Sequence, residues 1–249
     1  MSLLPPFANG TGVTAAPPHH ADRAMSALLF VQVVSLFVAI PLSGQHPAWH
    51  VVLDAGHLVF AAVSVAVLAH NRLTQALLLA ALALLAVGPI VGEHAMGIGA
   101  APMHLVIALT AFVFNALVTL LIARHVFGPG RVTAHRLRGA VLVYLNVASL
   151  FAIAYALIEA HAPGGIVMAD GQTFAARAGE RTAALTYFSL VTITTTGYGD
   201  IVPLHPIARS LANLESVFGH LFPATLLARL VALHLAHGDD PAGKGDAGA

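Results

Sequence analysis

The chain has 249 residues, of which 58% are hydrophobic and only 9% are Asp, Glu, Lys or Arg. A soluble domain carries about a quarter charged residues, so this composition excludes an ordinary water-exposed surface and indicates a membrane protein. The 11 basic and 11 acidic residues balance, and no basic excess favours nucleic acid as a partner. Because cysteine is absent, disulfides, thiolate metal sites and cysteine nucleophiles are excluded.

The first 24 residues are rich in Pro, Gly, Ala and Thr, without the basic start and apolar centre of a signal peptide. They are predicted to form a disordered arm. Crossing a bilayer takes about 20 mostly apolar residues, and six segments qualify as membrane helices. These six segments are Met25–Leu42, Trp49–Ala69, Leu73–Val91, Met103–Ala123, Gly139–Ala160 and Ile207–Leu235.

The sidedness of the six predicted helices follows from the basic residues around the fourth loop. Arg124, Arg131, Arg136 and Arg138 lie between the fourth and fifth segments, and positive charge marks the cytoplasmic side. With that loop inside, six crossings place both termini in the cytoplasm. The sequence therefore predicts an all-α, multi-pass protein of the cell membrane, with the lipid bilayer as a partner.

The region between the fifth and sixth segments has a different character. Residues 161–180 are polar, and residues 181–193 are apolar but too short to cross. A run of threonines and glycines, "TTTGYGD", follows at residues 194–200. Non-helical backbone at membrane depth is tolerated only where it is buried in protein or lines a watery cavity. We therefore expect a turret, a half-length re-entrant helix and a pore-lining loop.

The glycines of this loop suit a chain that presents its carbonyl oxygens to a dehydrated cation. Successive carbonyls point the same way only if the backbone alternates between right- and left-handed dihedrals, and glycine adopts the left-handed value without penalty. Gly197 and Gly199 are spaced by two and fit that alternation. The Thr195 hydroxyl can add an oxygen at the inner end, and the Tyr198 ring would brace the wall.

The stretch "TITTTGYGD" resembles the selectivity filter of potassium channels, usually written T-V-G-Y-G-D. The resemblance covers about 100 residues, from the fifth segment to the end of the sixth. This region is similar to the bacterial pore-domain channels of the ion-channel family. It implies a homotetramer, because one loop per chain supplies a quarter of the ring, with potassium as the permeant ion and no cofactor. The residues that it assigns to ion binding are Thr195, Thr196, Gly197, Tyr198 and Gly199, with Asp200 at the outer mouth.

The resemblance also implies roles for residues around the filter. Tyr187 and Phe188 match the aromatic support on the pore helix, Pro203 and Arg209 match common residues after the filter, and Gly219 matches the hinge of the inner helix. Two positions depart from the family. Thr196 replaces Val or Ile, with its hydroxyl directed behind the filter. Val191 replaces a glutamate that in some relatives bonds the outer aspartate, so Asp200 needs another partner or water.

Two further residues of the sixth segment are candidates for function. Glu215 is an intramembrane carboxyl that either lines the cavity or hydrogen-bonds the pore helix behind the filter, and we favour the second because Gly219 and Phe222 suit the pore axis better. Pro223 frees a backbone carbonyl and is expected to kink the helix, either as a gate bend or as a static kink.

The first four segments resemble the voltage-sensor bundle only by their number and topology. The fourth, Met103–Ala123, contains no Lys or Arg, so weak dependence on voltage is expected. Asp54, His57, Glu93 and His94 are predicted near the outer ends of their helices, where they could bind a divalent metal or sense protons. Ordinary interfacial histidines are the alternative.

The sequence thus predicts a disordered arm at 1–24, a four-helix bundle at 25–126, a basic cytoplasmic linker at 127–138, a pore domain at 139–237 and a disordered tail at 238–249. The predicted function is a potassium-selective channel without enzymatic activity, passive and not gated by voltage. One alternative is a non-selective monovalent cation channel, in which Thr196 relaxes selectivity. A more remote alternative is a membrane-embedded metal enzyme or metal transporter built on the outer His, Asp and Glu residues.

Overall fold

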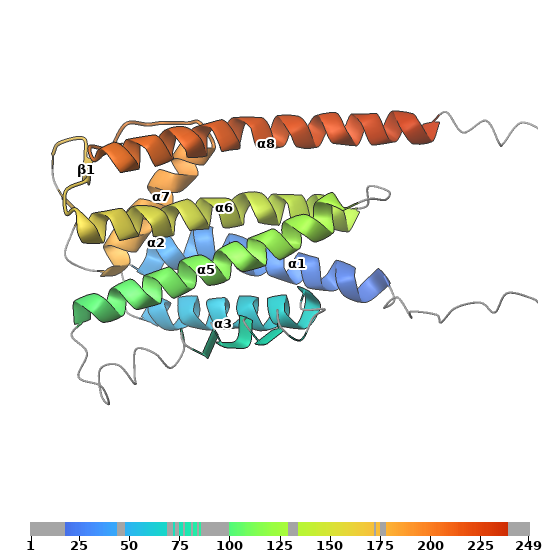
Figure 1. The fold of residues 1–249 in the computed structure, drawn as a ribbon, viewed down its shortest axis with the longest axis horizontal. Helices are drawn as coiled ribbons and strands as arrows, with labels where there is room; N and C mark the ends of the chain where they lie inside the picture. Colours follow the sequence, from blue (N-terminus) through green and yellow to red (C-terminus); the bar gives the residue numbers. More distant parts are fainter. Residues whose placement is uncertain are drawn as a thin grey trace, which may run out of the picture.

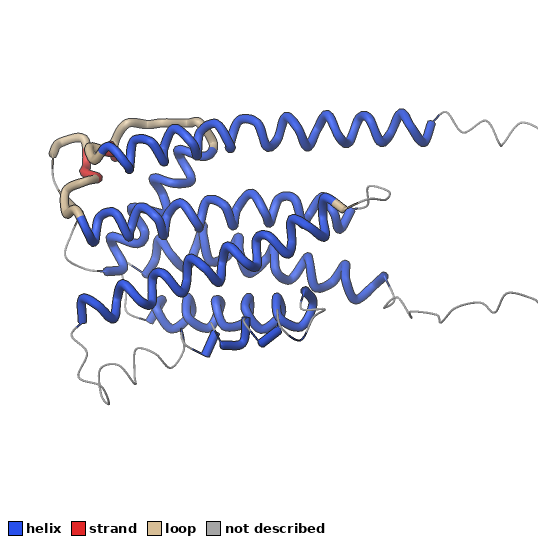
Figure 2. The backbone as a smooth tube through the Cα atoms, in the orientation of Figure 1, coloured by secondary structure: helices blue, strands red, loops and turns tan. Residues whose placement is uncertain are grey.

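The fold is known from a computed structural model. It describes residues 18–43, 48–68, 100–128, 134–171, 173–174 and 178–238, with nine residues between 72 and 85. Helices dominate these ranges, and Figure 2 shows that the strands are confined to one end of the molecule. The coarse prediction of an all-α membrane protein agrees with this result.

The first predicted crossing is a continuous helical segment with a local change of winding. It consists of α1 (Pro18–Val34), the π-helical turn η1 (Ser35–Ala39) and α2 (Ile40–Ser43). Pro41 lies two residues after the π turn, and its missing N–H and bulky ring disturb the preceding turn, a known cause of such irregularities. The helix begins at Pro18, so residues 18–24, assigned to a disordered arm, are helical. Proline favours this position because the first helical N–H has no partner.

Three longer helices follow among the described residues. They are α3 (Ala48–Leu68), α5 (Ala100–Phe127) and α6 (Ala134–His161). The last two have 28 residues each, which corresponds to about 42 Å of helix. The third predicted crossing, Leu73–Val91, lies mostly outside the described residues.

After α6 the chain forms a short helix, a long helix and a two-stranded sheet. Helix α7 (Ala178–Ile193) has 16 residues, or about 24 Å, less than the roughly 30 Å of a hydrocarbon core. Helix α8 (Pro206–Gly238) has 33 residues. Strands β1 (Ile166–Met168) and β2 (Ile201–Pro203) pair antiparallel, with Ile166 opposite Pro203. This sheet, which was not predicted, joins residues 166–168 to the segment that follows the loop at residues 194–200.

The helices lie along one common direction, except for α7. Figure 1 shows α8, α6, α5, α1 and α3 extending along the long axis, with α7 inclined between α6 and α8. Helix α6 occupies the centre of this arrangement, since it packs against α5, α1, α7 and α8. The short helix is therefore held between the two long helices of its own half.

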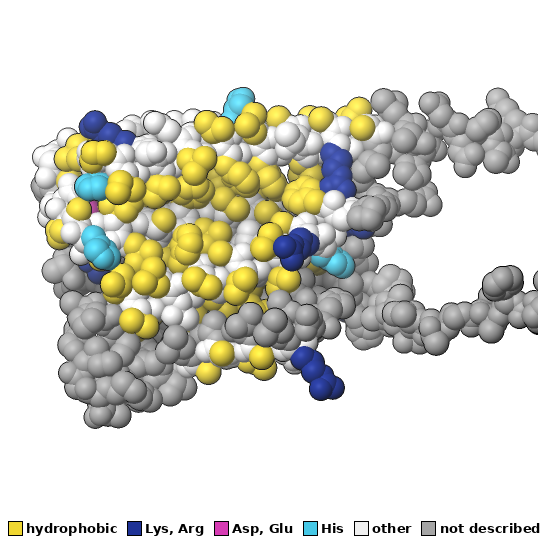
Figure 3. Space-filling view, viewed as in Figure 1, with side chains coloured by type: hydrophobic (Ala, Val, Ile, Leu, Met, Phe, Trp, Pro, Cys, Tyr) yellow, Lys and Arg dark blue, Asp and Glu magenta, His cyan; other side chains and the backbone are white. Residues whose placement is uncertain are grey.

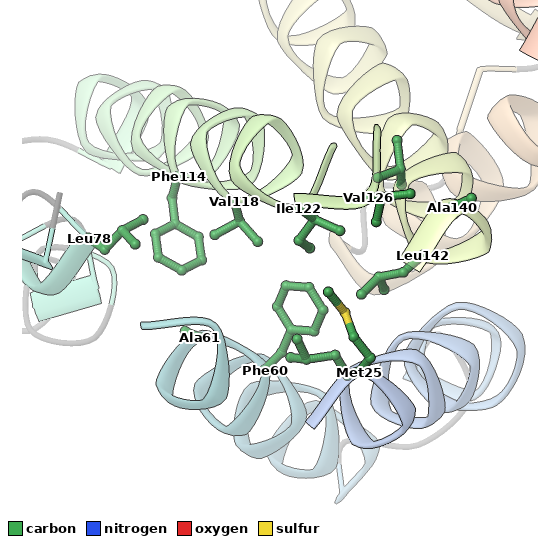
Figure 4. Close-up of a cluster of buried hydrophobic side chains, with 12 residues drawn as sticks. Met25, Phe60, Ala61, Leu78, Phe114, Val118, Ile122, Val126, Ala140 and Leu142 are labelled. Atoms are coloured by element: carbon green, nitrogen blue, oxygen red, sulfur yellow. The ribbon is translucent and has the colours of Figure 1, made fainter. Parts of the chain in front are cut away.

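The largest core cluster joins the N-terminal helices to α6. Figure 4 shows Met25 of α1, Phe60 of α3 and Phe114 of α5 directed into it, with Leu142 of α6 closing one side. A second cluster contains Tyr155 of α6, Phe188 of α7 and Ile166 of β1. The two clusters place the bundle on one side of α6 and the loop on the other.

The outer surface is consistent with a lipid environment. Three described helices are long and apolar enough to cross a membrane: Met25–Ser43, Leu105–Phe127 and Arg136–His161. Figure 3 shows hydrophobic side chains over the middle of the molecule, with Lys and Arg side chains toward its two ends. This distribution matches a bilayer core between two polar interfaces.

Candidate functional site

The loop between α7 and β2 lies at the surface of the single chain. Helix α7 ends at Ile193, where the threonine and glycine run begins. All seven residues from Thr194 to Asp200 are exposed. The chain thus places an irregular backbone segment directly after a helix that is too short to span a bilayer core.

The backbone of the loop alternates in hand. Thr195, Gly197 and Gly199 have φ values of 57°, 57° and 78°, in the left-handed region that L-residues other than glycine rarely adopt. The intervening Thr196 and Tyr198 have negative φ. The alternation expected for Gly197 and Gly199 is present, and it extends to Thr195. A β-branched residue in this conformation is strained, and such strain is concentrated at functional sites.

The amide groups of the loop are directed back toward α7. The Thr195 N–H donates to the carbonyl of Thr192 at 2.9 Å. The N–H groups of Thr196 and Gly197 both donate to the carbonyl of Val191, at 2.9 and 3.3 Å. With the donors turned inward, carbonyls of the same residues are left for the exposed side. Within the described ranges, none of the carbonyls from Thr195 to Tyr198 accepts a backbone hydrogen bond.

A short relay of hydroxyl groups supports the loop from behind. The Thr194 hydroxyl donates to the carbonyl of Leu190 at 2.7 Å, and the Thr196 hydroxyl lies 2.9 Å from the Thr194 hydroxyl. Because Thr194 uses its hydrogen on Leu190, Thr196 is the donor to Thr194. The hydroxyl that distinguishes Thr196 from the family's Val or Ile therefore has a partner.

At the outer end of the loop, Asp200 has a hydrogen-bond partner that the sequence did not identify. The Tyr187 hydroxyl donates to the Asp200 carboxylate at 2.8 Å, and the Tyr187 ring stacks on Tyr198 with centroids 6.5 Å apart. The Arg209 Nε donates to the Pro203 carbonyl at 2.9 Å. Phe188 has a different environment, since its ring packs behind the loop against Tyr155, 4.9 Å between centroids.

The C-terminal end of α7 is fixed by both neighbouring helices. The Tyr144 hydroxyl of α6 donates to the Ile193 carbonyl at 2.9 Å, and the Ser216 hydroxyl of α8 lies 3.4 Å from the Thr192 carbonyl. Helix carbonyls at a C-terminus lack intrahelical partners. The Tyr144 hydroxyl satisfies the carbonyl of Ile193, and the Ser216 hydroxyl adds a longer contact to the Thr192 carbonyl, which already accepts from the Thr195 N–H. Sequence reasoning missed Tyr144 and Ser216, whose signal was a hydroxyl on an otherwise apolar helix.

Glu215 lies behind the loop and is fully buried. Its two carboxyl oxygens contact the Tyr155 hydroxyl of α6, at 2.6 Å, and the Ser189 hydroxyl of α7. This is the second of the two positions considered for Glu215, because a residue that lines a cavity would be accessible. One carboxyl group thus bridges all three helices of the C-terminal half.

Gly219 and Phe222 do not lie where they were expected. Gly219 is buried, and a Cβ added there would lie 2.6 Å from the carbonyl carbon of Ile193 and closer still to its oxygen. Phe222 packs on Tyr144 and on Phe127 of α5. Both residues therefore face their own chain, and the exposed face of α8 carries Leu214, Val217 and Leu221 instead. Gly219 is a point of close helix packing.

Pro223 lies inside α8, which continues through it to Gly238. Its missing N–H would otherwise bond the carbonyl four residues earlier, that of Gly219. The one carbonyl of α8 that loses its partner is thus at the contact with α7. Figure 1 shows a single uninterrupted helix here.

The far end of α8 is attached to the end of α5. One terminal nitrogen of Arg229 donates to the carbonyls of Phe127 and Gly128, at 3.1 and 3.0 Å. Its guanidinium also lies over the Phe127 ring, 5.4 Å from the centroid. Arg136 donates to the same Gly128 carbonyl at 3.0 Å. Cations are stabilised at helix C-termini, so the start of the predicted basic linker joins the bundle to α8.

The residues proposed for metal binding are only partly described. His57 is exposed on α3, where Asp54 occupies the preceding turn. Glu93 and His94 lie outside the described residues. Among the residues that are described, no three His, Asp or Glu side chains form a group that could hold a metal ion.

Comparison with known proteins assigns this half of the chain to a functional class. Residues 140–234 match the model of a protein family described as "Ion channel". No curated protein matches the chain, and no solved structure matches it. The matched range begins in α6, includes the turret, α7 and the alternating loop, and ends in α8. The match, together with the apolar helices, identifies the region around this loop as an ion-channel domain in a membrane protein.

Proposed function

We propose that the protein is a potassium-selective channel that conducts passively through a filter formed by residues 195–199. The observation that carries the proposal is the alternating backbone of Thr195, Gly197 and Gly199. Consecutive carbonyls then line one side of an extended segment at about 3.3 Å per residue. In potassium channels, rings of such backbone carbonyls replace the hydration shell of the permeant ion.

The assembly that we propose is a homotetramer. One chain supplies one loop, and a ring of oxygens around an ion needs several loops. In the single chain the loop residues 194–200 are exposed, as are Leu214, Val217 and Leu221 on α8. An apolar helix face beside an exposed filter loop is what symmetric copies around a central axis would cover.

The proposed orientation places both termini in the cytoplasm. Arg124, Arg136 and Arg138 lie at the end of α5 and the start of α6, and Arg229 hydrogen-bonds there too. The filter loop and the turret lie at the other end of α6. The excess of arginine at the first end favours it as the cytoplasmic side.

A flux assay on reconstituted protein tests the function. Vesicles with purified protein should release potassium much faster than sodium, and empty vesicles should release neither. Equal release of the two ions would favour the non-selective cation channel instead. Release of neither ion, from protein shown to be folded, would contradict both.

The Thr196 hydroxyl distinguishes the selective from the non-selective hypothesis. Thr196→Val removes the hydrogen bond to Thr194 but keeps a β-branched side chain of similar volume. We expect potassium selectivity to be retained, with a loss of stability of about 1 kcal/mol, the usual contribution of one hydrogen bond. A large gain in selectivity would show that the wild-type hydroxyl loosens the filter.

A further inference from the structure

The contacts around Glu215 contain more oxygen pairs than hydroxyl hydrogens. The Tyr155 hydroxyl is 2.6 Å from one carboxyl oxygen, and the Ser189 hydroxyl contacts the other. The same Ser189 hydroxyl lies 2.7 Å from the Ala148 carbonyl of α6. Each of these three oxygen–oxygen contacts needs one hydrogen between its atoms.

Two of the three hydrogens come from the hydroxyl groups. The Tyr155 hydrogen lies on the contact with Glu215, because an ionised or neutral carboxyl can accept it. The Ala148 carbonyl can only accept, so the Ser189 hydrogen lies on that contact. The contact between Ser189 and Glu215 is then left without a hydrogen unless the carboxyl supplies one.

We propose that Glu215 is a neutral carboxylic acid that donates to Ser189 while it accepts from Tyr155. The hydrogen bonds then run in one direction, from Tyr155 to Glu215, from Glu215 to Ser189 and from Ser189 to Ala148. A single hydrogen shared by two acceptors would give two long, bent contacts, and both contacts of Ser189 are short.

The surroundings of Glu215 agree with an uncharged group. The side chain is completely buried, and an isolated carboxylate in such surroundings would be costly. The titratable groups near enough to interact with it are the phenols of Tyr155 and Tyr144. Neither phenol is a cation, so neither of these two described groups could compensate a negative charge on Glu215.

The neutral form gives Glu215 the task of a positioning residue. Its acid group joins α8 to the pore helix and, through Tyr155 and Ser189, to α6, and so holds the base of the filter loop. It adds no negative charge beside the conduction path. This consequence for conduction depends on the proposed channel function, whereas the protonation state itself does not.

Infrared difference spectroscopy tests the protonation state directly. The spectrum of the wild-type protein minus that of Glu215→Gln, at near-neutral pH, should contain the carbonyl stretch of a neutral carboxyl group. That band should persist after exchange into slightly more alkaline buffer. Carboxylate bands in its place would overturn the proposal, whether or not the protein conducts potassium.

Matched substitutions test the direction of the hydrogen bonds. A glutamine at position 215 can accept from Tyr155 with its oxygen and donate to Ser189 with its nitrogen, so Glu215→Gln should retain the wild-type Tm. Glu215→Ala removes both bonds and should lower it. A glutamine variant as unstable as the alanine variant would contradict the proposal.

Glu159 provides the control for these variants. It is also buried, but its two oxygens accept from the N–H groups of Gly164 and Ile166, at 2.7 and 3.0 Å. Both partners are donors, so Glu159 needs no hydrogen of its own. Glu159→Gln would direct an amide N–H against a backbone N–H and should lower the Tm. Equal tolerance of glutamine at both positions would contradict the different hydrogen-bond directions that are assigned to Glu215 and Glu159.

Discussion

Different interactions connect the helices within each half of this protein. Between α6, α7 and α8, side-chain hydrogen bonds connect residues far apart in sequence, as in Tyr144 to Ile193 and Tyr155 to Glu215. In α5 the hydroxyls of Thr110 and Thr119 bond to their own helix, one turn back. The helices of the bundle meet instead through an apolar cluster around Met25, Phe60 and Phe114.

This difference follows from what each half has to hold. An apolar interface between helices tolerates changes of side chain as long as volume is kept. An exposed loop with strained dihedrals stays in place only if its surroundings over-determine it. The comparison predicts that small changes beside the loop have large effects, whereas similar changes in the bundle have small ones.

The largest effect is expected at the filter loop itself. Gly197→Ala would force a side chain into a left-handed conformation at a cost of about 1–2 kcal/mol and place a methyl group at the ion path. In the single chain the Cβ would meet no described atom within 4 Å, so the chain should still fold and assemble. We expect potassium flux from reconstituted vesicles to be lost.

Gly171→Ala is the matched control for this substitution. Gly171 has a φ of 82° in the turret and likewise has open space around its missing Cβ. An alanine at position 171 imposes comparable backbone strain away from the loop, and potassium flux should continue. Normal flux in Gly197→Ala would mean that residues 195–199 do not form the filter.

The next largest effect is expected where α8 crosses the pore helix. Gly219→Ala would place a methyl group on the backbone of Ile193, which cannot move aside as a flexible side chain can. Overpacking typically costs about 1–3 kcal/mol, and thermal unfolding in detergent should show a clear drop in Tm. In the bundle, Gly56→Ala meets only the Ser35 hydroxyl, at 3.3 Å, and should lower the Tm little. Equal losses would remove the distinction between the halves.

An intermediate effect is expected at the attachment between the halves. Arg229→Gln shortens the side chain and removes two charge-assisted bonds to the end of α5, together with the contact over Phe127. Such bonds contribute about 2 kcal/mol, so chemical denaturation should show a loss of that order. Arg124→Gln, at an exposed position in the last turn of α5, should lower the free energy of unfolding by less than about 1 kcal/mol. A neutral Arg229 variant would show that the attachment does not stabilise the fold.

The smallest effect is expected from voltage, because the bundle lacks the required charges. Moving one elementary charge across the membrane supplies about 2.3 kcal/mol per 100 mV, and steep gating needs three to four charges per subunit. Helix α5 has no Lys or Arg between Met103 and Ala123, and Arg124 lies in its last turn. Open probability in planar bilayers should therefore vary weakly with potential. A steep sigmoid curve would assign the bundle a sensing role.

The sequence predicted those features that depend on local chemistry. Gly197 and Gly199 indicated the alternating backbone, and the short apolar run before them indicated the half-length helix. Features that depend on which helix faces which residue were not accessible. Gly219 was predicted to be a hinge from the resemblance alone, and no pattern in the sequence showed its close approach to Ile193. The role of Tyr187 as partner of Asp200 depends on two residues that are 13 positions apart. The pairing of β1 with β2 brings together short strands on either side of α7.

The most direct test of the central proposal is the reversal potential with potassium on one side of a planar bilayer and sodium on the other. A filter of backbone carbonyls at residues 195–199 predicts a reversal potential far from zero, with the sign set by potassium, and its disappearance with the current in Gly197→Ala. A wild-type current that reverses near zero would contradict potassium selectivity.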